Sequence, residues 1–131
     1  MIALIIRIFF IILAGFFNAV MDTLHTNRYS KSIFVKWKIF KNHQQFLDPS
    51  VSARNKWKNG DKKQGEKFFG SSTFLVFLTD GWHLAKFLMT LCFAIALCTS
   101  VIIFSVYLDW AIYWILFGFS FEMFFRRLWK A

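Results

Sequence analysis

The sequence is poor in cysteine, proline and acidic residues, and it lacks the common catalytic motifs. It has two cysteines, one proline, and 7 acidic against 16 basic residues. Cys92 and Cys98 lie inside an apolar run without a CxxC motif or a disulfide framework, so buried, reduced thiols are expected. No GxSxG, Walker, HExxH or Rossmann glycine pattern occurs. No nucleic-acid-binding motif accompanies the net charge of +9, so nucleic acid is not an expected partner.

Apolar residues are abundant, and basic residues are sorted along the chain. Hydrophobic residues make up 57% of the 131, above the usual share for a soluble domain, so the excess must lie in lipid or at an interface. Arg7 is the one basic residue among the first 21. Eleven fall in residues 22–72, Lys86 follows, and three stand in the last six residues. Basic clusters beside apolar spans indicate membrane orientation.

The first apolar run, residues 1–21, predicts transmembrane helix 1. Twenty-one helical residues reach about 31 Å, enough to cross a bilayer core. Arg7 lies near the start of this run, where its long side chain is expected to extend to the outer surface. No positive charge precedes the run, which favours an uncleaved anchor over a signal peptide.

The second apolar region, residues 68–108, is too long for one helix across a membrane, and within it residues 73–108 are the part assigned to the membrane. It predicts an interfacial segment followed by transmembrane helix 2. Residues 87–108 contain no charged side chain and form the predicted span. Residues 73–85 are expected to form an interfacial or re-entrant helix, because Asp80 and His83 would be costly at the middle of a bilayer.

Residues 110–125 predict transmembrane helix 3, and residues 126–131 form a basic tail. Only Asp109 separates the second and third predicted spans, which indicates a tight hairpin. The expected fold is therefore an all-α membrane protein with three transmembrane helices and a basic cytoplasmic loop at 22–72. This topology puts 15 of the 16 basic residues on one side, which predicts a cytoplasmic (inner) membrane protein with its N-terminus out and its C-terminus in.

The loop 22–72 is the one extended polar segment, and it is too polar and too short for a secure core of its own. Asp48 and Pro49 predict the start of a short helix that ends at Asn59. Residues 32–41 mix basic and apolar side chains, so the apolar ones can enter the headgroup zone while the lysines stay at the surface. The bilayer and its anionic lipid headgroups are the expected partners.

A duplicated spacing suggests a metal site. Asp22 and His25 follow the first span, and Asp80 and His83 precede the second. Residues i and i+3 share a helix face, so each pair could offer one carboxylate and one imidazole in the same direction. Two facing pairs have the ligand chemistry of a Zn, Mn or Fe site. The competing interpretation is that water and headgroups solvate polar residues at span ends.

Further residues extend this hypothesis. Asn18 lies on the helix face of the first Asp/His pair, and Gly15 and Gly118 are expected to let the first and third spans pack closely. Glu122 would serve as a fifth ligand or general base. The metal would activate water for hydrolysis or group transfer on a lipid-linked substrate. Basic residues near the span ends would hold an anionic headgroup: Arg28, Lys86, Arg126 and Arg127.

Two stretches carry a resemblance to a known group. AGFFNAVMDTL with the nearby SIF, and RNKWKNGD followed by GSSTFLVFLTDGWHLAKF, resemble small multi-span membrane proteins of unknown function from bacterial and bacteriophage genomes. The resemblance covers residues 14–87 and implies no known activity. The three-span layout is also similar to one class of phage holins, although the long basic loop departs from that pattern. A non-enzymatic interaction, accessory or permeabilising role is thus the alternative to an enzyme, and homo-oligomerisation is open.

Overall fold

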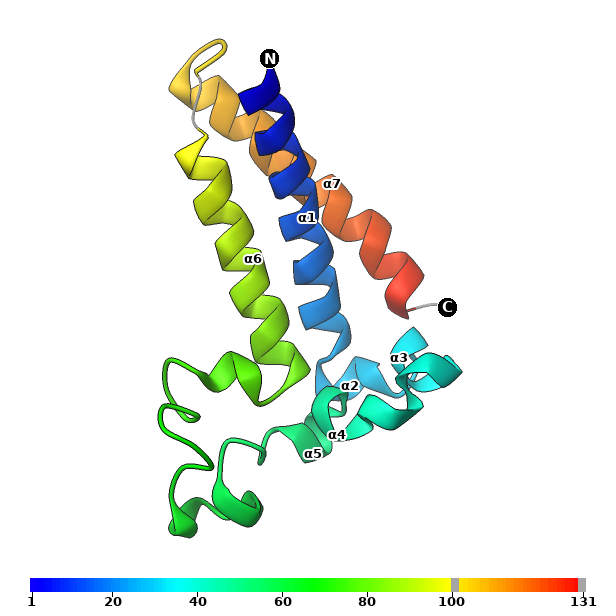
Figure 1. The fold of residues 1–131 in the computed structure, drawn as a ribbon. Helices are drawn as coiled ribbons and strands as arrows, with labels where there is room; N and C mark the ends of the chain where they lie inside the picture. The colour runs from blue at the N-terminus through cyan, green and yellow to red at the C-terminus, as the bar shows by residue number, and fades with distance from the viewer. Residues whose placement is uncertain (100–101, 130–131) are drawn as a thin grey trace.

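The computed structural model of the chain describes residues 1–99 and 102–129, apart from the side chain of Thr26 (Figure 1). Three long helices dominate it: α1 (Ile2–Thr23), α6 (Gly81–Cys98) and α7 (Val106–Trp129). All three are long and apolar enough to cross a membrane by length and composition. The predicted all-helical fold with three spanning segments is therefore confirmed at this level. Residues 100–101 of the predicted second span, and 130–131 of the predicted tail, lie outside the described residues.

Helix α1 is the central element, because it packs against both α6 and α7. Figure 1 shows α7 crossing behind α1 and diverging from α6 toward its C-terminal end. The α1–α7 crossing requires a glycine: a Cβ on Gly15 would lie 1.8 Å from Ser120 Oγ and 2.9 Å from the carbonyl oxygen of Phe117. The predicted role of Gly15 in close packing is thus confirmed. Gly118 was expected to share it, but it faces open space, because α7 turns Ser120 toward α1.

Short helices and turns make up the segment between α1 and α6. They are α2 (Thr26–Tyr29), α3 (Ile33–Lys36), η1 (Lys38–His43), α4 (Gln44–Leu47), α5 (Pro49–Ser52), η2 (Lys58–Gly60), η3 (Lys62–Gln64) and η4 (Val76–Leu78). Helices α2 to α5 lie across the end of the long helices where α1 finishes (Figure 1). Residues 54–70 extend beyond them, away from the spans (Figure 1). No strand occurs among the described residues, and Trp57 and Glu66 form an isolated antiparallel bridge.

The first half of this segment shares a hydrophobic core with the ends of α1 and α7. The buried members are Ala19, Leu24, Tyr29, Ile33, Phe34 and Leu128. Gln44 links the short helices to one another, because its side-chain amide donates to the backbone carbonyls of Phe34 and Phe40, at 2.9 Å each. The Tyr29 hydroxyl donates to the Gln44 side-chain oxygen. The loop therefore gains a core by packing against the long helices.

The boundary between the second and third spans differs from the prediction. Helix α6 ends at Cys98 and α7 begins at Val106, so residues 87–108 do not form one helix, and Asp109 lies within the first turns of α7. Two polar side chains set this boundary. Ser105 Oγ accepts from the Leu108 amide at 3.2 Å, and the Asp109 carboxylate accepts from the amides of Ile103 and Phe104 at 2.7 and 3.2 Å. The backbone amides of residues 103 and 104 thus have hydrogen-bond acceptors although these residues are not helical. At its other end, α7 runs to Trp129, beyond the predicted end at residue 125.

The helix predicted from Pro49 to Asn59 is much shorter than expected. It begins as predicted, with the Asp48 carboxylate accepting from the Ser50 amide at 2.9 Å, but α5 ends at Ser52. Asn55 explains the early end: its side-chain amide donates to the carbonyls of Gln45 and Thr79, at 2.7 and 3.0 Å. These bonds tie the chain to two neighbouring segments, and Asn59 adopts a positive φ of 51°.

Candidate functional site

The second Asp/His pair is a helix cap. Asp80 is the N-cap of α6, and its carboxylate accepts from the His83 backbone amide at 2.9 Å. His83 Nδ1 lies 2.7 Å from the other carboxylate oxygen, which also accepts from the Thr79 hydroxyl at 3.3 Å. Asp80 and His83 thus face each other at the start of α6, where the carboxylate is engaged by the His83 amide and ring. The Asp-Gly sequence before an apolar run is an N-cap signal that explains this role.

The first Asp/His pair is divided by the end of α1. Asp22 lies in the last turn of α1, which finishes at Thr23, and His25 is the exposed N-cap residue of α2. The Asp22 carboxylate accepts from the Arg28 guanidinium at 3.3 Å. Neither pair therefore lies within a single helix, although the side chains of Asp80 and His83 are in direct contact.

The predicted ligands are not gathered into one cluster. Within residues 1–99 and 102–129, no group of three or more His, Cys, Asp or Glu side chains could hold a metal ion. Glu122, the predicted fifth ligand or base, is exposed on α7 and accepts from Arg126 Nε at 2.7 Å. Metal binding itself stays a prediction, without the converging geometry that suggested it.

The remaining predicted residues are half-buried or exposed. Asn18 is half-buried on α1, and Arg127 is exposed on α7. The Arg28 guanidinium lies over the Phe125 ring at 5.1 Å, and the Lys86 ammonium lies over the Trp82 ring at 5.2 Å. Both cations therefore lie against aromatic faces.

Arg7 was expected to reach the outer surface, and this prediction is wrong. Its side chain is 6% exposed and lies between helices. The guanidinium donates to the Tyr113 hydroxyl at 2.9 Å and to the Thr99 carbonyl at 2.8 Å, and it lies over the Tyr113 ring at 5.1 Å. The end of α6 and the first turns of α7 cover it, which supplies the acceptors a buried cation needs. The sequence shows that Arg7 is the one charged side chain in the first apolar run, but it does not show which groups contact it.

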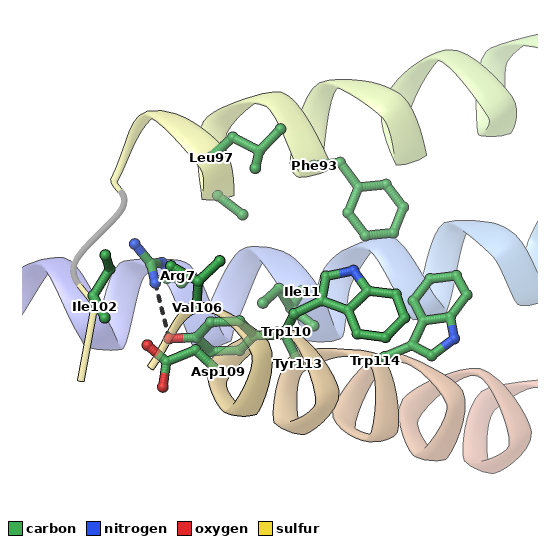
Figure 2. Close-up of a pocket in the computed structure, with 11 residues that line it drawn as sticks. Arg7, Ile11, Phe93, Leu97, Ile102, Val106, Asp109, Trp110, Tyr113 and Trp114 are labelled. Carbon is green, nitrogen blue, oxygen red and sulfur yellow. Dashed lines mark hydrogen bonds between the residues drawn. The ribbon is translucent and has the colours of Figure 1, made fainter. Parts of the chain in front are cut away.

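A cavity of about 500 Å³ opens beside Arg7 (Figure 2). Helix α1 contributes Arg7 and Ile11, α6 contributes one wall that includes Phe93 and Leu97, and α7 contributes the facing wall. Figure 2 shows Trp110 and Trp114 on that facing wall, with Asp109 at the same end as Arg7. Except at this end, where charged groups gather, the lining is largely apolar.

A basic and apolar surface lies at the opposite end of the molecule. We call residues 31–41 the basic platform. Val35, Trp37 and Ile39 are 41%, 55% and 72% exposed there. Four exposed lysines accompany them: Lys31, Lys36, Lys38 and Lys41. The buried side chains of Ile33 and Phe34 pack with Leu128, so the platform is fixed at the end of α7.

Glu66 organises the turn that follows the isolated bridge. Its carboxylate accepts from the amides of Gly70 and Ser72 at 3.0 and 3.2 Å, and from the Ser72 hydroxyl. The hydroxyl bond and then the two amide bonds lower the pKa of Glu66 from its ordinary value of 4.5. These bonds stabilise the turn through the ionised form.

Acid is therefore expected to loosen this turn. Because the folded pKa is depressed, the contribution of Glu66 is complete above pH 4.5 and is lost as the pH falls through the folded value. Amide hydrogen exchange at Gly70 and Ser72, corrected for its intrinsic pH dependence, should stay slow from neutral pH down to the lowered pKa of Glu66. It should accelerate at pH values below that pKa. Glu66→Gln should exchange fast and without this acid step; a step of equal size in Glu66→Gln would contradict the assignment.

Comparison of the chain with protein-family models, with curated proteins and with solved structures finds no match.

Proposed function

We propose that the chain is a non-enzymatic protein of the cytoplasmic membrane that holds its basic platform on the anionic inner leaflet. In this proposal its N-terminus is outside and its C-terminus inside. The support for the orientation is the sorting of basic residues, of which only Arg7 precedes residue 22. The proposed partners are the bilayer and its anionic headgroups.

The exposed apolar residues of the platform carry the proposal. Trp37 and Ile39 lie on a segment fixed against the end of α7, and both are more than half exposed. Apolar side chains flanked by lysines gain free energy when they enter the headgroup zone, through buried area and attraction to anionic lipid together. Each nearby lysine contributes about 1 kcal/mol at an anionic surface, and less at high salt.

The observed contacts favour this role over metal-dependent hydrolysis. Asp80 is engaged in capping α6, Asp22 faces Arg28, and Glu122 faces Arg126. Each carboxylate of the proposed metal site thus has a neighbouring partner of its own. The platform, in contrast, has exposed apolar surface for which a bilayer provides the burial.

Spin labels on the full chain in lipid nanodiscs would test the proposal. In a Cys92→Ala, Cys98→Ser background, one variant carries a label at Ile39→Cys and a matched one at Lys63→Cys, which is exposed on the distal turn η3. In anionic nanodiscs the label at 39 should be accessible to oxygen and protected from a water-soluble relaxant. The label at 63 should stay accessible to the water-soluble relaxant.

The response to lipid charge and salt completes this test. Zwitterionic lipid or high salt should reduce immersion of the label at position 39, because both weaken the attraction of the lysines. Full aqueous exposure of position 39 in anionic nanodiscs would overturn the proposal. Equal immersion of positions 39 and 63 would overturn the role of the platform in particular.

A further inference from the structure

A second pocket, of about 280 Å³, lies in the polar segment between α1 and α6. One wall comes from the end of η1 and from α4, and the other comes from Lys67, Phe68 and the residues just before α6. Its volume is near the lower limit of ligand sites, about 300 Å³, so it suits a small chemical group. Unlike the cavity beside Arg7, it has a lining that is more polar than apolar.

The two walls of this pocket are held together by Asn55, which is itself part of the lining. Its side-chain amide donates to the Gln45 carbonyl on one wall and to the Thr79 carbonyl on the other, at 2.7 and 3.0 Å. Lys67 is fixed through its backbone, because its amide donates to the Lys56 carbonyl at 3.0 Å. The pocket is therefore preformed, which lowers the entropy cost of binding a ligand.

The lining is rich in hydrogen-bond donors. Four of its residues have donor side chains: Asn42, His43, Gln45 and Lys67. None of these side chains bonds to another residue within the described part of the chain. The described residues of the lining include no acidic one, so no carboxylate in the pocket offsets the Lys67 ammonium. Several donors beside a positive charge suit an anion.

The type of anion follows from the donors and from the apolar part of the lining. A phosphomonoester offers three acceptor oxygens and more negative charge than a carboxylate, so it can use more of these donors. Phe46, Phe68 and Leu78 complete the lining. Phe68 is 37% exposed and Leu78 is 55% exposed, so both keep apolar surface that an organic group can cover.

We infer that this pocket binds a phosphomonoester, with the phosphate on Lys67 and His43 and the organic group against Phe68 and Leu78. The Asn42 side chain supplies a further donor. Soluble phosphate esters and the headgroup of phosphatidic acid both carry this group. None of these five residues belongs to the basic platform, so the inference does not depend on the proposed role of the platform.

Calorimetric titration of the full chain in zwitterionic nanodiscs would test the inference, with phenyl phosphate as the probe. Phenyl phosphate should bind more tightly than inorganic phosphate or phenol, because each of these lacks either the organic group or the phosphate. Lys67→Gln should weaken the binding of phenyl phosphate by about tenfold, as expected when a hydrogen bond to a charged group is lost. Lys58→Gln is the matched control, because Lys58 is exposed on the same segment outside the lining and its loss changes the net charge equally.

A second titration distinguishes the two sources of the phosphate. The nanodiscs now contain phosphatidic acid or phosphatidylglycerol, adjusted to the same surface charge. If the ligand is a lipid headgroup, phosphatidic acid should compete with phenyl phosphate and weaken its binding more than phosphatidylglycerol does. Equal affinities in the two kinds of nanodisc would assign the pocket to a soluble phosphate ester.

Three results would contradict the inference. Equal affinity of Lys67→Gln and Lys58→Gln for phenyl phosphate would overturn the site. Phenol that binds the unaltered chain as tightly as phenyl phosphate would overturn the role of the phosphate. Leu78→Ser should reduce the preference for phenyl phosphate over inorganic phosphate, and an unchanged preference would overturn the placement of the organic group.

Discussion

Replacing Gly15 with leucine is expected to force α1 and α7 apart. Even the Cβ of alanine would lie 1.8 Å from Ser120 Oγ and 2.9 Å from the Phe117 carbonyl oxygen, and backbone cannot rotate away as a side chain can. Overpacking a tight contact costs about 1–3 kcal/mol, and separating the helices adds the loss of their shared core. We expect Gly15→Leu to lower the free energy of unfolding in detergent by at least about 3 kcal/mol.

Gly118→Leu is the matched control, because no atom lies within 4 Å of a Cβ built at this position on the same pair of helices. It should leave the free energy of unfolding nearly unchanged. Gly15→Ala should fall between the two, and adding Ser120→Gly should rescue it only in part, since the Phe117 carbonyl remains. Equal stability of the two leucine variants would show that α1 and α7 do not cross at Gly15.

The number and approximate position of the spans could be predicted because hydropathy acts over whole helices. Which side of a helix meets its neighbour could not. Gly15 and Gly118 are both small residues within apolar spans, so the sequence does not distinguish them. In the structure α7 turns Ser120 toward α1, and Gly118 faces open space. Helix rotation is decided by how all side chains pack together, and a stripe of small residues offers only one of several close approaches.

Helix ends were the weaker part of the prediction, because single polar side chains set them. Residues 87–108 contain no charged side chain, so hydropathy did not reveal the helix boundary that Ser105 and Asp109 set. The contacts of Arg7 could not be predicted for a similar reason. A charge near a span end can reach water or find partners in the protein, and its partners Tyr113 and Thr99 are distant in sequence. Sequence spacing carries no information about such contacts.

Asp80 gives a second large expected effect, and it separates a capping role from a metal-binding one. Asp80 is 3% exposed and supports the His83 amide, the His83 ring and the Thr79 hydroxyl. Asp80→Ala should lower the free energy of unfolding by about 2–3 kcal/mol, since an N-cap is worth about 1 and buried donors lose their acceptor as well. Asp61→Ala is the control: Asp61 makes a similar bond to the Lys63 amide on an exposed turn, so its loss should cost little.

Asp80→Asn distinguishes the two roles, because asparagine caps a helix about as well as aspartate but is a much poorer metal ligand. If Asp80 serves as the cap, Asp80→Asn should retain most of the stability that Asp80→Ala loses. Metal content of the purified full chain supplies the second measurement. A metal carried by the unaltered protein and lost from both Asp80 variants would restore the metal site, and an Asn variant as unstable as the Ala variant would refute the cap. If Asp80→Asn is stable, Asp80→Ala is unstable, and neither substitution changes the metal content, Asp80 acts as the N-cap of α6.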